Sequence, residues 1–143
     1  MGPIVCATRG GEASRRTQER AIALAEQKRS ALVFILIADP SMSNTLSGRK
    51  DDALVDELSQ LGHRLLNIAR QRAAERGLTA DTVVCVGPLQ ETLEQYVRQV
   101  RASTLVIGAP QLASREQAGS PEDLPAFAKH IQAATGVEVV VVT

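Results

Sequence analysis

Short, continuous apolar segments alternate along this chain with longer segments whose apolar residues recur every three or four positions. A continuous apolar run of four to eight residues is typical of a strand covered on both faces, whereas the three-to-four spacing is typical of an amphipathic helix. Because the two patterns alternate along the whole chain, the sequence predicts an α/β protein with a parallel sheet. The predicted strands cover residues 4–8, 31–38, 82–86, 104–107 and 137–143.

Four helices are predicted between the strands, over residues 13–29, 52–76, 88–100 and 121–135. Pro88 is expected at the first position of the third helix and Ser120 as the N-cap of the fourth, while Gly77 and Gly136 should end two helices. The pattern predicts one domain over residues 1–143, an open five-stranded parallel sheet with helices on both faces. In such a sheet a ligand binds at the carboxyl ends of the strands, at a switch point. Periodicity leaves the strand order open.

Each predicted helix carries a stripe of residues that should pack on the sheet. In the first helix these residues are Thr17, Ala21, Leu24, Ala25 and Lys28. In the long second helix they are Leu54, Leu58, Leu61, Leu65, Ile68, Ala69 and Ala73.

Composition excludes several classes of function. The 16 Lys and Arg residues balance 16 Asp and Glu residues, so a protein that mainly grips nucleic acid or an anionic membrane is not expected. Phe34, Tyr96 and Phe127 are the only aromatic residues, which argues against a module that stacks nucleic-acid bases. No apolar run approaches the roughly 20 residues of a membrane span, and no signal segment is evident. We therefore expect a cytoplasmic protein.

The cysteines and histidines show no metal or nucleophile motif. Cys6 and Cys85 each lie inside an apolar run without a companion at metal-ligand spacing, which predicts reduced core residues. His63 and His130 have no Cys, Asp or His three or four residues further on, so a metal site is not expected. Neither histidine can be tied to a nucleophile, and the sequence contains no G-x-S-x-G. These observations predict a protein that is not an enzyme.

Two motifs resemble those of the universal stress protein (UspA-type) family. Residues 84–88 read V-C-V-G-P before a predicted helix, and residues 102–108 read A-S-T-L-V-I-G, similar to the family's V-x-x-G-x-P and A-D-L-I-V-M-G. With the order of elements, the resemblance covers residues 3–143. It implies the adenine nucleotide alpha hydrolase-like fold, a Rossmann-like sandwich, in a protein of the stress response.

The last predicted strand points to a partner. It is apolar and terminal, so we expect it to lie at the centre of the sheet or to be covered, because an exposed apolar edge favours aggregation. The resemblance implies a homodimer paired through this strand. The expected interface residues are Val137, Val139, Val140, Val141 and Val142.

Many members of the family bind ATP, and the residues for it are altered here. The family has an Asp at the end of the first strand, where this chain has Arg9. The family's phosphate loop reads G-x-x-G, nine residues, then G-S or G-T. Gly108 matches its first glycine, but Gln111 stands at the second, and Gly119-Ser120 follows after only seven residues. A backbone cradle for phosphates needs these glycines, so we expect no ATP binding of the usual family kind.

A small anionic ligand remains compatible with the predicted strand ends. Thr8, Arg9, Gly10 and Gly11 follow the first strand, where Arg9 can attract a phosphate or carboxylate; a plain surface turn is the alternative. Asp39 ends the second strand, and an Asp-Pro turn explains it equally well. Ser120 presents a helix N-terminus to an anion or acts only as a cap.

The sequence thus favours a small non-catalytic binding or regulatory module. One alternative is a stress protein that binds ATP, AMP or a cyclic dinucleotide through Gly108 and Ser120. Another is an interaction module that regulates a transporter or a kinase. No cofactor is required by the residues themselves, and an adenine nucleotide is the ligand that the resemblance implies.

Overall fold

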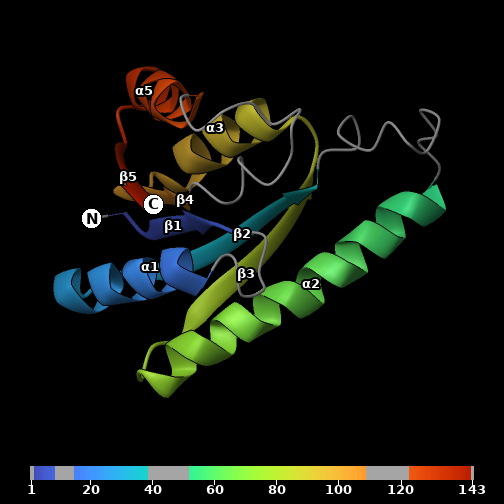
Figure 1. Ribbon diagram of the computed structural model, residues 1–143, viewed down its shortest axis with the longest axis horizontal. Helices are drawn as coiled ribbons and strands as arrows, with labels where there is room; N and C mark the ends of the chain where they lie inside the picture. Colours follow the sequence, from blue (N-terminus) through green and yellow to red (C-terminus); the bar gives the residue numbers. More distant parts are fainter. Residues whose placement is uncertain (1, 9–14, 39–51, 109–122, 143) are drawn as a thin grey trace.

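A computed structural model describes residues 2–8, 15–38, 52–108 and 123–142, and the following description covers these residues alone. The strands are β1 (Ile4–Ala7), β2 (Leu32–Ala38), β3 (Ala80–Val86), β4 (Thr104–Gly108) and β5 (Glu138–Val142). The helices are α1 (Arg15–Lys28), α2 (Asp52–Glu75), α3 (Leu89–Val100) and α5 (Asp123–Thr135). This alternation confirms the predicted α/β class (Figure 1).

The strands form one parallel sheet in the order β3-β2-β1-β4-β5. At its centre, Cys6 of β1 is paired with Phe34 of β2 on one side and with Val106 of β4 on the other. The last strand therefore lies at an edge and not at the centre. Of the two arrangements expected for this strand, the structure excludes the first.

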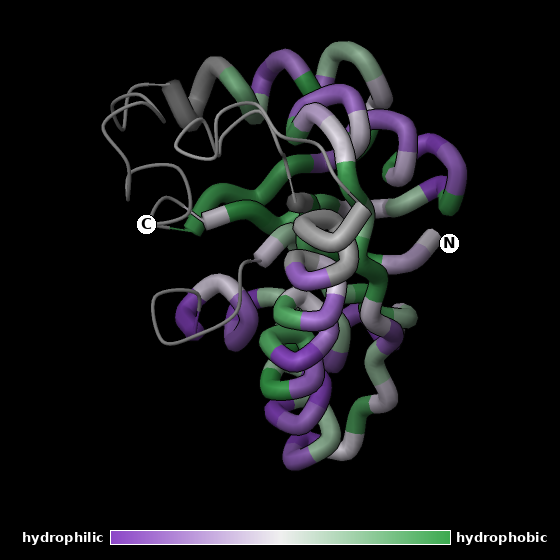
Figure 2. The backbone as a smooth tube through the Cα atoms, turned by 90° about the vertical axis from the view of Figure 1, so that its right-hand side faces the viewer, coloured by the Kyte–Doolittle hydropathy of each residue, from purple (hydrophilic) through white to green (hydrophobic). Residues whose placement is uncertain are grey.

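Helices cover both faces of the sheet, with α1 and α2 below the strands in Figure 1 and α3 and α5 above them. Successive residues of β1 point to opposite faces: Cys6 belongs to the core under α1 and α2, and Val5 to the core under α3 and α5. Both are fully buried. The continuous apolar runs of the inner strands arise because both faces of these strands meet a helix layer, and Figure 2 shows the hydrophobic strands between the helices.

The packing face of α2 differs in part from the predicted stripe. Leu61 and Ile68 are 47% and 41% exposed. Ala69 and Ala73 are fully buried as predicted, and Leu66 and Gly62, which were not part of the predicted stripe, are buried as well. A Cβ atom at Gly62 would lie 3.1 Å from the Val84 side chain, so small residues let the helix approach the sheet closely. The helix has two apolar stripes about 100° apart, and the prediction placed part of the exposed one on the sheet.

The prediction for α1 was also partly wrong. Gln18 and Ile22 are buried but were not predicted to be, and Lys28 lies at the surface, while Leu24 is half-buried and packs against the core. Thr17, Ala21 and Ala25 are buried as predicted. A polar residue in the core was not expected from the apolar spacing.

Helix boundaries follow local backbone chemistry. Pro88 is the N-cap of α3 and not its first helical residue, because its ψ of 133° is extended. Its carbonyl accepts the first helical hydrogen bond from the Thr92 N–H, at 3.0 Å. Gly77 and Gly136, with φ of +82° and +77°, end α2 and α5 as predicted. Ser120 lies outside the described residues.

Candidate functional site

The switch point of the sheet lies between β1 and β4. After β1 the chain continues to α1 on one face, and after β4 it continues to α5 on the other. Adjacent parallel strands whose connections leave to opposite faces form a crevice at their carboxyl ends, where open α/β sheets bind ligands. Thr8 directly follows β1, and Gly108 is the last residue of β4. The structure therefore brings these two predicted site residues to neighbouring strand ends.

A buried polar network holds the end of β1. The Gln18 side-chain amide donates a hydrogen bond to the Thr8 hydroxyl at 3.0 Å, and the Arg72 guanidinium donates to the Gln18 carbonyl oxygen at 2.6 Å. Gln18 is 0% exposed and Thr8 2% exposed. The Thr8 N–H also donates to the Ile35 carbonyl of β2, at 3.0 Å. The charged donor fixes which end of the amide faces which partner.

This network connects three elements at the ligand edge of the sheet. Thr8 follows β1, Gln18 lies in the first turn of α1, and Arg72 comes from α2. A buried amide with both ends satisfied costs little, but loss of one partner leaves a polar atom unpaired. The network therefore fixes the position of the β1 end relative to the two helices. Sequence analysis missed Gln18 and Arg72, and the available signal was a glutamine four residues before Ile22 on a buried helix face.

Gly108 has a packing role in addition to its place at the switch point. A Cβ atom built there would lie 2.0 Å from the Thr17 hydroxyl oxygen. Thr17 is 1% exposed and belongs to the first turn of α1. Glycine is required at this position because α1 packs directly on the end of β4. Its presence alone does not identify a phosphate loop.

The other predicted ligand residues lie outside the described residues. Thr8 and Gly108 are the members of the predicted set whose positions are given above. The remaining residues of the set are Arg9, Gly10, Gly11, Asp39, Gln111, Gly119 and Ser120.

The two cysteines are free thiols, as predicted. Cys6 lies in the core, and its Sγ is 3.9 Å from the Thr17 carbonyl oxygen. Burial raises the pKa of the Cys6 thiol, and burial also raises the pKa of Cys85, which is half-buried on β3. A thiol that stays protonated at neutral pH is a poor nucleophile, so neither cysteine is poised for chemistry.

His130 has a carboxylate partner that its sequence neighbourhood did not reveal. Its Nε2 lies 3.1 Å from a carboxylate oxygen of Glu94, which links α5 to α3. The Gln90 side chain donates to the same Glu94 oxygen at 3.2 Å. His63 lies at the surface of α2. Within residues 2–8, 15–38, 52–108 and 123–142, no three His, Cys, Asp or Glu side chains come together as metal ligands.

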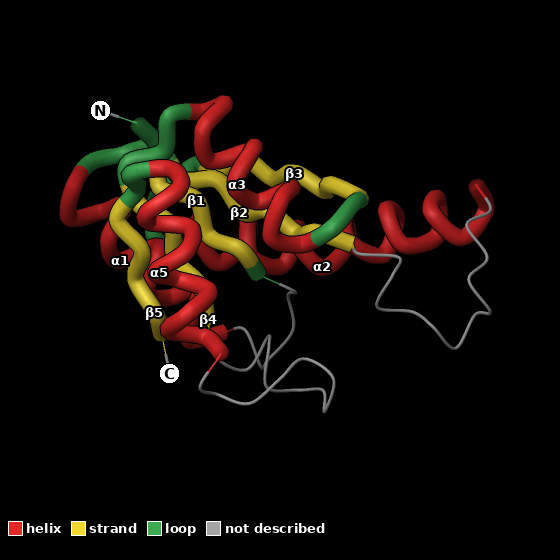
Figure 3. The backbone as a smooth tube through the Cα atoms, turned by 90° about the horizontal axis from the view of Figure 1, so that it is seen from above, coloured by secondary structure: helices red, strands yellow, loops and turns green. Residues whose placement is uncertain are grey.

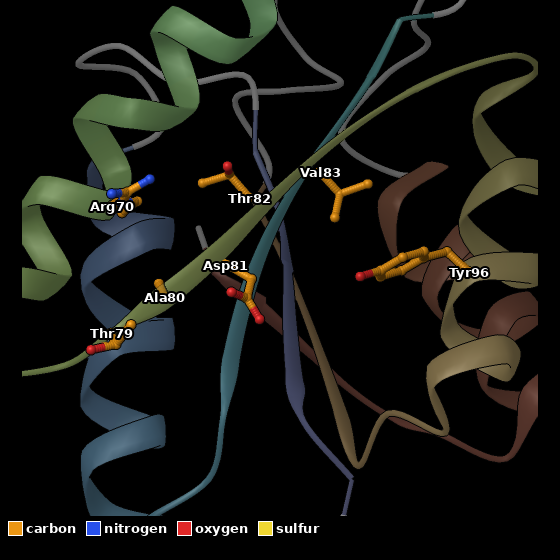
Figure 4. Close-up of a pocket in the computed structure, with 7 residues that line it drawn as sticks. All are labelled: Arg70, Thr79, Ala80, Asp81, Thr82, Val83 and Tyr96. Carbon is orange, nitrogen blue, oxygen red and sulfur yellow. The ribbon is translucent and has the colours of Figure 1, made fainter.

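A groove of about 580 Å³ follows the open edge of β3. Arg70 of α2 and Tyr96 of α3 flank it on either side of the strand in Figure 4. Burial raises the pKa of Tyr96, and the nearby Cys85 and Asp81 raise it further. The groove is formed by the first half of β3, away from the carboxyl ends of β1 and β4, so it is separate from the switch point.

The order of strands and the position of the crevice define a class, the open α/β sandwiches with a ligand edge at a central switch point. The sequence matches the model of the Universal stress protein family over residues 1–123, and the chain belongs to this family. A search among curated proteins gives no significant match. None of the helices in the described part of the chain is long and apolar enough to cross a membrane.

Solved universal stress proteins have the same fold. A family member from Burkholderia pseudomallei is 21% identical, with a TM-score of 0.68 over 97% of this chain and 94% of its own. A universal stress protein in complex with cAMP is 23% identical, with a TM-score of 0.70 over 99% of this chain and 97% of its own. The Archaeoglobus fulgidus protein in complex with dAMP is 16% identical, with a TM-score of 0.70 over 100% of this chain and 98% of its own.

Proposed function

We propose that this protein is a non-catalytic regulatory module of the stress response that binds an adenine nucleoside monophosphate between the ends of β1 and β4. The observation that carries the proposal is the Thr8–Gln18–Arg72 network, which fixes one wall of the switch-point crevice beside Gly108. A preorganised wall lowers the ordering cost of binding a small ligand. Two proteins of similar fold are complexes with adenine monophosphates, cAMP and dAMP.

A monophosphate suits this sequence better than a triphosphate. A triphosphate needs a long backbone cradle, and here Gln111 replaces a glycine in a loop that is two residues shorter than the family's. Arg9 replaces the family's acidic residue and adds a positive charge next to Thr8 in the sequence. One guanidinium can bind one phosphate through two hydrogen bonds. The proposal therefore combines Arg9 with a strand end of fixed geometry.

The proposal also includes assembly and location. Two copies pair through their β5 strands, with contact residues among Val139, Val140, Val141 and Val142. Val137 is 3% exposed and already packs in its own core, so it contributes indirectly. The free thiols of Cys6 and Cys85 suit the reducing cytoplasm, where we place the protein.

Calorimetric titration with AMP, cAMP and ATP tests the binding proposal. We expect a monophosphate to bind at micromolar concentration and ATP to bind at least about tenfold more weakly, which corresponds to roughly 1.4 kcal/mol. Arg9→Ala should weaken monophosphate binding about tenfold, because a charge-assisted hydrogen bond contributes about 1.5–3 kcal/mol. Arg20→Ala is the matched control, since Arg20 is an exposed arginine on α1.

Two results would contradict the proposal. One is tightest binding by ATP, which would restore the usual family function. The other is the absence of heat for all three nucleotides up to millimolar concentration, which would favour the module that acts only through protein partners.

A further inference from the structure

The first half of α2 extends past the sheet. Figures 1 and 3 show its N-terminal end projecting beyond the strands that its C-terminal half covers. The helix has 24 residues and β3 has seven. At about 1.5 Å per helical residue and 3.3 Å per strand residue, α2 is about 36 Å long and β3 about 23 Å. The helix is thus longer than the strand on which it packs.

An apolar stripe follows α2 on the flank that is not packed on the sheet. Leu61 and Ile68 are exposed, while Leu65 between them is half-buried and packs in part against the core under α1 and α2. The spacing of four and then three residues continues in the sequence to Leu58 and Leu54. A strict four-three alternation of apolar residues is the pattern by which two helices pair in a coiled coil. The sheet-facing residues Gly62, Leu66, Ala69 and Ala73 belong to the other stripe.

Charged residues lie beside this stripe. Glu57 and Arg64 are both exposed, one heptad apart, on the side of the stripe that turns away from the sheet. Within the described part of the chain neither has an ion-pair partner. Charges at this heptad position set the partner and the orientation of a coiled coil.

We infer that the exposed stripe of α2 pairs antiparallel with α2 of a second copy of this chain. In one antiparallel register, position 58 lies opposite position 61 of the other copy and position 54 lies opposite position 65, and the sequence has leucine at all four positions. The same register places Glu57 opposite Arg64 of the other copy, twice by symmetry. The register that pairs the leucine positions therefore also brings both ion pairs together.

The charges also select this register over its alternatives. A shift by one heptad places Arg64 opposite Arg64 of the other copy, where the two charges repel each other. A parallel pair places Glu57 opposite Gly62 and Arg64 opposite Ala69, which gives no ion pair. The partner that fits both the stripe and the charges is the same helix in the opposite direction.

This interface is independent of nucleotide binding and lies on a different part of the molecule from β5. A chain with two self-complementary surfaces forms assemblies larger than a dimer. Loss of β5 pairing therefore leaves an α2-paired dimer, and loss of both interfaces leaves a monomer. This difference separates the present inference from the proposed β5 pairing.

Sedimentation of the Val141→Lys chain tests the inference, because lysine at that strand edge removes the other interface. We expect this chain to form a dimer at tens of micromolar concentration. Leu61→Glu in the same background should raise its dissociation constant by about tenfold or more, because it places a charge in an apolar interface. Asn67→Glu is the matched control, since Asn67 is exposed on α2 and lies off the stripe.

A charge exchange gives the sharper result. In the same background, Glu57→Arg should weaken the dimer several-fold, and adding Arg64→Glu should restore it, since the opposite charges meet again. If Glu57→Arg weakened the dimer only by perturbing α2 itself, Arg64→Glu would not restore the dimer. A monomeric Val141→Lys chain at these concentrations, or a double variant as weak as the single one, would overturn the inference.

Discussion

The two edges of the sheet differ in how they are protected. The β3 edge carries the exposed carboxylate Asp81 and is flanked by Arg70 and Tyr96, which rise from the helices on either side. The β5 edge consists of valines after Glu138, and Val141 is 37% exposed. Charged residues on an edge strand prevent other strands from adding to it. The sheet is thus protected from pairing at β3, while β5 has the composition of a strand that pairs.

The strongest test of this difference places a charge on the β5 edge. In a chain whose α2 stripe is already interrupted by Leu61→Glu, we expect a β5-paired dimer. Val141→Lys should then raise the dimer dissociation constant by about a hundredfold, because a charged lysine replaces an apolar side chain in the interface and loses water. Light scattering measures the mass, and Gln99→Lys, an exposed position on α3, is the control. An unchanged dimer would show that β5 does not pair.

The opposite change removes protection from the β3 edge. Asp81→Val replaces the exposed carboxylate at the second residue of β3 with an apolar side chain. We expect the variant to aggregate at concentrations several-fold below those tolerated by the parent chain, because an apolar edge strand adds further strands. Turbidity during slow concentration measures this effect. Glu91→Val removes an exposed acid from α3 and should leave solubility nearly unchanged; equal aggregation of both variants would contradict the role of the edge.

Sequence patterns predicted both edge strands but not their places in the sheet. The continuous apolar runs marked β1, β2 and β4 because both faces of these strands meet helices. Strand order depends on which strands pair across the sheet, and this information is not present in the period of any one segment. The candidate site likewise combines residues that the sequence predicts with residues that it does not. Thr8 was predicted from the end of a strand and Gly108 from the resemblance to the family's phosphate loop, whereas Gln18 and Arg72 meet across 54 positions of sequence, and no local pattern joins them.

The pKa of Tyr96 depends in part on the charge of Asp81 at the β3 edge. Burial raises the pKa of Tyr96, with further contributions from Cys85 and Asp81, so Asp81→Asn should lower the pKa of Tyr96 toward its usual value. The sequence has one tyrosine, and ultraviolet titration of the phenolate follows it without interference. Gln95→Glu, an exposed change on the same helix, tests whether any new charge has this effect. An unchanged pKa in the Asp81→Asn chain would separate Asp81 from the groove.

The raised pKa of Tyr96 makes the free energy of unfolding depend on pH in alkaline solution. Tyr96 keeps its proton in the folded state after the unfolded chain has lost it, so the unfolded state binds fewer protons above about pH 10. The Tyr96 contribution to the free energy of unfolding is therefore fully present below about pH 10 and decreases as the pH rises. Tyr96→Phe should make the denaturation midpoint less dependent on pH in that range.

The smallest effect is expected from Glu138, the charged residue at the start of β5. Glu138 begins the strand, and its carboxylate lies 3.7 Å from Lys28 Nζ, with the two side chains 65% and 35% exposed. An exposed ion pair contributes about 0–1 kcal/mol, so Glu138→Gln should change the free energy of unfolding by less than about 0.5 kcal/mol and should leave pairing through Val141 intact. Urea denaturation at low and high salt measures both chains. A loss above about 1 kcal/mol, or loss of the dimer, would mean that the charge at the start of β5 directs pairing and that the valines alone do not.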